Sequence, residues 1–161
     1  MSTREHFVRC FAAEVPTFVK VLKALPEGQT GYRPHPRCSS AAEIAWLLAS
    51  ELKDACDLVD ACEASFSQST PPATFGESVA AYERNAAALA EKLAVVEDET
   101  WEKSARFLVG GQVAWEAPLG DMLWGFLFDA IHHRGQLSSY LRPMGGKVPS
   151  IYGPSGDDPG A

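Results

Sequence analysis

A carboxylate and an imidazole at helical spacing are the side chains of this sequence best placed to do chemistry. Asp129 and His133 stand four residues apart in a stretch, about 119–142, whose apolar residues recur at helical intervals. Side chains at that spacing lie on one face of a helix. Carboxylate and imidazole groups suit divalent transition metals. The pair therefore predicts a metal site or, in a metal-free pocket, a hydrogen-bonded ion pair.

Glu51 is the third candidate ligand. It is the one charged residue on the apolar stripe of a second predicted helix, about 41–64. Its long side chain leans toward the start of that helix, back to the level of Leu47. We interpret Glu51, Asp129 and His133 as a candidate set of two carboxylates and one histidine for Zn, Ni, Mn or Fe. The alternative is that Glu51 pairs with a lysine or arginine at the edge of the bundle.

The residues around this pair have less direct roles. His132 points about 100° away from His133 around the helix and is not expected to be a ligand. Arg134 lies off the inner stripe and is expected to anchor a connecting segment or the tail. Gly135 is expected to allow another helix to approach closely, and Glu14, on an apolar stripe near the start of the chain, is a further candidate neighbour of the site.

The remaining sequence predicts the elements that would position these groups. Apolar residues recur at helical spacing over about 3–25, 41–64, 75–96 and 119–142. The fold class predicted is all-α: one domain, 1–161, in which a four-helix bundle buries all four apolar stripes. Residues 106–115, around Gly110 and Gly111, predict a short hairpin or extended excursion before the last helix. The tail, 149–161, is expected to lie over the surface of the bundle.

Two segments also resemble a known family. The sequence HHRGQL at 132–137, followed by Tyr140, Arg142 and Gly145, resembles the closing helix of the DinB-like (DNA-damage-inducible) family of metalloenzymes, and Ser40 to Leu47 resembles its second helix. The resemblance implies a bundle in up-down-down-up order. It also implies a metal held by three histidines, one from the second helix and two from the last. His133 matches the last of these positions, whereas Leu47 and Asp129 occupy the other two.

The resemblance implies two possible functions. Several relatives use the metal to activate a low-molecular-weight thiol, which then attacks a small electrophile, so one expectation is a metal-dependent, thiol-dependent transferase. The other is a non-catalytic, metal-free DinB-like protein that binds a small molecule or a partner. Bundles of this family often pair through helix faces, and the aromatic residues Phe7, Trp46 and Trp124 add to the expectation of a homodimer.

Composition narrows the possible partners. The formal net charge is −7, which argues against binding to nucleic acid, because phosphate recognition requires a concentrated basic surface. No run approaches the roughly 18 apolar residues of a membrane span. The first residues contain no signal-peptide core, which predicts a cytoplasmic location. The four cysteines form no C-x-x-C pair and are expected to be free thiols.

Overall fold

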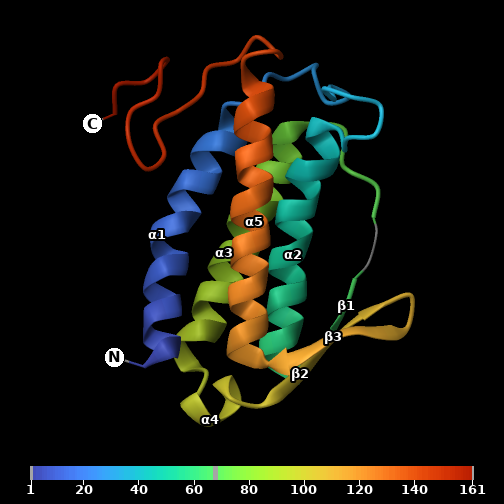
Figure 1. The fold of residues 1–161 in the computed structure, drawn as a ribbon, viewed down its shortest axis with the longest axis vertical. Helices are drawn as coiled ribbons and strands as arrows, with labels where there is room; N and C mark the ends of the chain where they lie inside the picture. The colour runs from blue at the N-terminus through green and yellow to red at the C-terminus, as the bar shows by residue number, and fades with distance from the viewer. Residues whose placement is uncertain (1, 67–68, 161) are drawn as a thin grey trace.

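The structure, a computed structural model, describes residues 2–66 and 69–160 and is mostly helical (Figure 1). Its four long helices are α1 (Thr3–Lys23), α2 (Ala41–Ala61), α3 (Phe75–Val95) and α5 (Leu119–Leu141), and α4 (Asp98–Trp101) is a single turn. Each long helix begins at the expected residue and ends one to three residues earlier than expected. The sequence periodicity therefore locates the elements that carry the candidate ligands.

Local hydrogen bonds explain where the first three long helices begin. The Ser40 hydroxyl accepts the Glu43 amide N–H, and the Glu43 carboxylate accepts the Ser40 amide N–H at 2.6 Å. The same reciprocal arrangement starts α1 and α3. Each such box satisfies two amide groups that have no partner within the helix. For α2 it fixes the first turn, and with it the position of Glu51 along the helix.

The long helices pack side by side around an apolar core. α1 contacts α3 and α5, and α2 contacts the same two helices, so α5 lies between α1 and α2 on the face seen in Figure 1. The largest fully buried side chains come from all four long helices: Phe7, Phe18, Leu22, Ile44, Leu48, Leu58, Phe75, Tyr82, Leu89, Leu93, Leu119 and Met122. None of the described helices combines the length and apolar character needed to span a bilayer. The up-down-down-up order stays a prediction.

A small sheet corrects the all-α expectation. Strands β2 (Ser104–Val109) and β3 (Gln112–Pro118) form an antiparallel hairpin, and β1 (Glu63–Ser65) pairs with β2 in parallel. The hairpin turns at Gly110 and Gly111, whose φ angles of 58° and 78° are readily adopted only by glycine. The predicted hairpin is therefore confirmed. The third strand was missed because three residues carry no periodic signal.

The sheet lies at one end of the bundle, beside α2 and α5 (Figure 1). The left-handed conformation of Cys62, with φ of 52°, ends α2 and turns the chain into β1. β3 leads directly into α5. Since the sheet is connected to the ends of both helices, its side chains are placed against the groove between α2 and α5.

Candidate metal centre

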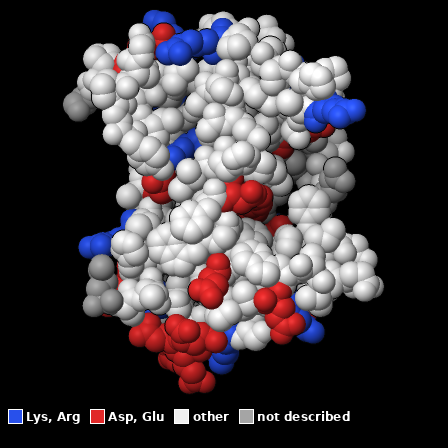
Figure 2. Space-filling view, in the orientation of Figure 1, with Lys and Arg blue, Asp and Glu red and all other residues white. Residues whose placement is uncertain are grey.

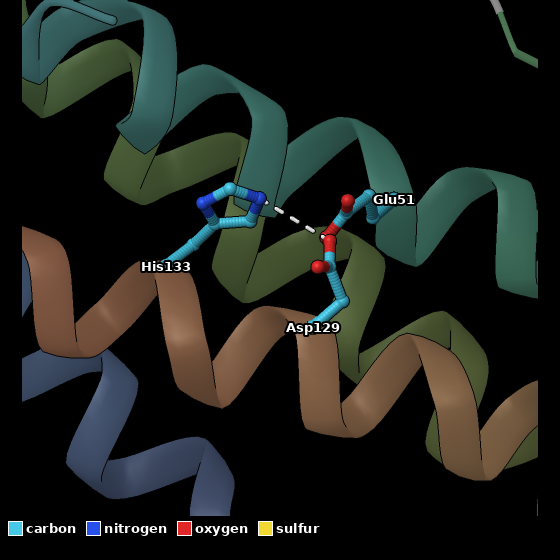
Figure 3. Close-up of side chains that lie close together, drawn as sticks. All are labelled: Glu51, Asp129 and His133. Carbon is cyan, nitrogen blue, oxygen red and sulfur yellow. Dashed lines mark ion pairs between the residues drawn. The ribbon is translucent and has the colours of Figure 1, made fainter. Parts of the chain in front are cut away.

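The groove between α2 and α5 brings the three predicted ligands together. Glu51 comes from α2, and Asp129 and His133 come from successive turns of α5 (Figure 3). One ligand atom from each lies within 4.8 Å of the other two. The His133 Nε2 atom lies 3.2 Å from Asp129 Oδ2. Metal bonds of about 2.1 Å allow ligand atoms to be at most about 4.2 Å apart, so small side-chain rotations would complete the set.

A residue that the sequence did not single out orients the His133 ring. The His133 Nδ1 atom lies 2.8 Å from Gln136 Oε1, and Gln136 Nε2 lies 3.0 Å from His132 Nε2. An amide oxygen can only accept, so the hydrogen on His133 is on Nδ1 and Nε2 points toward the carboxylates. Metal-binding histidines are commonly held in this way by a second hydrogen bond. Gln136 is three residues after His133, a spacing that could have indicated the contact.

Glu51 has an electrostatic environment unlike that of an ordinary surface carboxylate. Its Oε2 atom is buried and, among the described residues, has no hydrogen-bond partner. Burial raises the pKa of Glu51 to about 9, with further contributions from the Asp129 and Asp54 carboxylates. No described ion pair includes Glu51, so the expected alternative of a lysine or arginine partner is wrong. A buried carboxyl oxygen without a partner is costly unless a proton or cation compensates it.

The three groups together require positive charge. With Nδ1 donating to Gln136, the His133 Nε2 lone pair, the Asp129 carboxylate and the Glu51 carboxyl all present acceptor atoms to one another. In the metal-free protein a proton on Glu51, whose pKa is raised by burial, supplies part of that charge. A single divalent cation would supply it for all three at once. The donor set and the partnerless Glu51 oxygen therefore fit a transition metal.

The site opens to solvent through Asp129. The Asp129 side chain is 56 % exposed, whereas that of His133 is 19 % exposed. Figure 2 shows acidic side chains in the middle of the face that α2 and α5 form, surrounded mainly by uncharged atoms. A pocket of about 430 Å³ reaches Glu51 and Asp129 from this side and is otherwise lined by apolar residues, Leu47 among them. A small molecule could thus approach the carboxylates directly.

The other residues considered from the sequence lie outside this cluster. Glu14 binds Arg134 and the Tyr152 hydroxyl instead. Arg134 is buried and also donates to Tyr152, which confirms that it anchors the tail. A Cβ at Gly135 would meet nothing within 4 Å, so the expected close helix approach there is wrong.

The aromatic residues are divided between core and surface. Phe7 is buried and packs against Trp124, so it is not available to a partner. Trp46 donates to Ser69 and lines a second groove, of about 670 Å³, which also includes Leu47. Phe128, which the sequence did not single out in this respect, stacks on Trp124 and is 61 % exposed.

Comparison with known proteins then relates this architecture to a family. Residues 1–159 match the DinB family. The chain belongs to the DinB family. The resemblance seen in HHRGQL and in the second helix is therefore confirmed.

Two solved DinB-like structures share the fold. A DinB-like protein of Bacillus cereus is 18 % identical, with a TM-score of 0.76, and the match covers 92 % of this chain and 97 % of that protein. A DinB-like protein of Bacillus subtilis is 15 % identical, with a TM-score of 0.72 and coverage of 91 % and 96 %. No curated protein matches the chain. At these identities the two structures establish the DinB fold alone.

The candidate ligand positions distinguish this DinB-family chain from the three-histidine pattern that the sequence resemblance implied. Leu47 has no donor atom, but Glu51, one turn further along α2, lies beside Asp129 and His133. Asp129 stands in the place of a histidine and still faces the site. The result is an oxygen-rich set of two carboxylates and one imidazole.

Proposed function

We propose that this DinB-family protein binds one divalent transition metal through Glu51, Asp129 and His133 and is a metal-dependent enzyme acting on a small molecule. The observation that carries the proposal is the buried Glu51 Oε2 atom, which has no described hydrogen-bond partner and lies beside two further ligand groups. Zn, Ni, Mn and Fe all accept such donors.

Each residue of the site has a distinct part. Glu51 and Asp129 would supply oxygen ligands, and His133 would supply Nε2. Gln136 keeps the His133 proton on Nδ1, so the metal-facing nitrogen stays unprotonated. The apolar walls of the adjoining pocket offer the carboxylates no charged partner on that side. The Asp129 side chain is more exposed than that of His133, so a substrate can reach the site beside Asp129.

The reaction we propose is a thiol-dependent transfer to a small electrophile. A bound divalent metal would act as a Lewis acid and lower the pKa of a low-molecular-weight thiol that occupies the open position. The thiol proton would pass to water at the exposed side of the site. The sulfur would then form the new bond to the electrophilic carbon, while the bond from that carbon to the leaving group breaks and the leaving group departs with its electron pair. The chain's contribution is to orient both reactants at the mouth of the groove between α2 and α5.

A metal-free binding protein is the second candidate. The observation that favours it is the raised pKa of Glu51, about 9, which keeps this carboxyl protonated at neutral pH without any metal. The pocket would then bind a small molecule without chemistry. Both candidates use the same groove, but they differ in whether a cation replaces the proton.

Metal analysis separates the two candidates. The protein, prepared without a histidine tag, is stripped with a chelator and reloaded separately with Zn²⁺, Ni²⁺, Mn²⁺ or Fe²⁺. We expect about one equivalent of at least one metal to be retained. Glu51→Ala and His133→Ala should lose it, whereas His35→Ala, at an exposed loop position, should keep it. If the wild type retains none of the four metals, the enzyme proposal is wrong and the metal-free binding protein is the better candidate.

A further inference from the structure

The pocket beside the metal centre has walls of one chemical kind. Its apolar walls come from α2, from the segment just after β1, from β2 and β3, and from the first half of α5. The residues, in that order, are Leu47, Phe66, Phe107, Val109, Trp115, Gly125 and Phe126. Its two polar members among the described residues are Glu51 and Asp129. The volume of about 430 Å³ lies in the range of small-molecule sites, roughly 300–1,000 Å³.

The charge of the pocket limits what can enter it. No lysine or arginine is among its described lining residues, and both of its ionisable groups are carboxyl groups. An anionic group would therefore be desolvated by apolar walls and would meet Asp129 without any compensating cation of the chain. An uncharged group loses little hydration free energy on entering the pocket, and it gains contact with the aromatic side chains.

Trp115 forms a wall of defined shape. A Cβ on Gly125 would lie 2.3 Å from Cη2 of the Trp115 ring, so the indole rests directly on the backbone of α5. The ring is close to parallel with that of Phe126, at 12° and with 6.5 Å between centroids. Gly125 lies one turn before Asp129, on the same face of α5. The flat indole is thereby held next to the carboxylates.

The sheet leaves this apolar surface partly open. Trp115 and Phe66 are each 37 % exposed and Val109 is 47 % exposed. Clustered apolar side chains that stay in contact with water commonly mark a binding site. Here they surround a cavity that ends at ionisable groups, which is the arrangement of a small-molecule site with an apolar body and a polar end.

We propose that this pocket binds the uncharged aromatic part of the substrate, with Trp115 stacking on it and the reactive end directed toward Glu51 and Asp129. The pocket takes planar neutral groups and rejects anionic ones. The inference rests on the proposed function only in naming this molecule a substrate, since binding in the pocket does not itself require a metal.

Two naphthyl probes test the pocket: neutral naphthalene-2-methanol and anionic naphthalene-2-sulfonate, both poor metal ligands. Their binding to the full-length protein is measured by saturation-transfer NMR and calorimetry, before and after treatment with a chelator. We expect the alcohol to bind at least about 10-fold more tightly than the sulfonate in the chelator-treated protein, because the anion must then be desolvated beside Asp129. A bound metal would offset the charge of Asp129, so the preference should be smaller before chelation. Equal binding of the two probes to the chelator-treated protein, or no binding of the alcohol to it, would overturn the inference.

Variants locate the bound ring. Gly125→Ala displaces the Trp115 indole and should weaken binding of the alcohol by about 2- to 10-fold, the usual contribution of one aromatic contact. Gly135→Ala is the matched control on the same helix, since the space there is open, and should bind as the wild type does. Trp115→Ala removes the same wall without a steric clash, which keeps the test available if Gly125→Ala does not fold. Unchanged binding in Trp115→Ala would refute the stacking role.

The outcome is independent of the metal assay. A protein that retains no metal but prefers the alcohol in a Trp115-dependent way would contradict the proposed enzyme and support the pocket. A protein that retains metal through Glu51 and His133 but shows no preference between the probes after chelation would support the metal centre and contradict the pocket.

Discussion

The buried carboxyl of Glu51 makes the stability of the metal-free protein depend on pH. Its pKa is raised from the ordinary 4.5 to about 9. A carboxyl whose pKa is higher in the folded than in the unfolded state makes its full contribution to stability at pH values below its unfolded-state pKa. That contribution is lost as the pH rises toward the folded-state pKa. Each pH unit between 4.5 and 9 therefore lowers the free energy of unfolding by about 1.4 kcal/mol. The total loss by pH 7 is roughly 3 kcal/mol.

Replacing Glu51 with glutamine removes this dependence while keeping the size of the side chain. We expect the wild type to lose stability relative to Glu51→Gln as the pH rises from about 5 to about 8.5, with a difference of about 3 kcal/mol between pH 5 and pH 7. Urea unfolding of chelator-treated protein at several pH values measures this. Glu43→Gln is the contrasting control, because hydrogen bonds from Ser40 lower the pKa of Glu43. Its effect should have the opposite sign and appear only below about pH 4.5, so that Glu43→Gln should keep the pH dependence of the wild type between pH 5 and pH 8.5.

Adding metal should reverse the ranking of the two proteins. The wild type gains stability by mass action, about 4.1 kcal/mol at a metal concentration one thousand times the dissociation constant, which exceeds the roughly 3 kcal/mol lost by pH 7. Glu51→Gln lacks the charged ligand and should gain much less. Because the metal must displace a proton from Glu51, the gain of the wild type should increase with pH. A constant stability difference between the two proteins from pH 5 to pH 8.5 would show that Glu51 is solvated and would refute the argument.

Four further predictions concern other residues. Leu47→His should increase metal affinity in a binding titration, because position 47 lines the same pocket as Glu51; unchanged affinity would contradict this. Arg134→Ala should destabilise the protein by about 3–5 kcal/mol in urea unfolding, since it leaves the Glu14 carboxylate without its cationic partner. Light scattering should give about twice the 17.4 kDa chain mass, and Phe128→Ser should reduce it if α5 forms the interface. With a net charge of −7, no salt-sensitive binding to duplex DNA is expected in a mobility-shift assay at about 0.15 M salt.

The sequence predicted those features that local spacing encodes. The starts of α1, α2 and α3 follow from side chains three residues apart, such as Ser40 and Glu43, which need nothing else to form their hydrogen bonds. Glu51 was identifiable because a lone charge on an apolar stripe must find compensation inside the fold. Asp129 and His133 share a helix, so their approach was determined by the helix itself.

Features that depend on distant segments could not be predicted in this way. β1 exists because Glu63 pairs with Arg106, across 43 residues that carry no common pattern. The contact of Trp115 with Gly125 depends on how the hairpin folds back on α5. Apolar residues in 106–115 indicated an extended excursion, but not that its side chains would form a wall beside the carboxylates.

The Arg134 cluster has a consequence for the order of folding. The Glu14 carboxylate binds Arg134, 120 residues later, and Tyr152, 138 residues later. Contacts so distant in sequence form late, because a long loop must close before they provide any stabilisation. On the ribosome, α1 therefore emerges with a carboxylate whose partners have not yet been synthesised. Arg134 and Tyr152 complete the packing of the first helix, so α1 cannot reach its native stability until residue 152 has been synthesised.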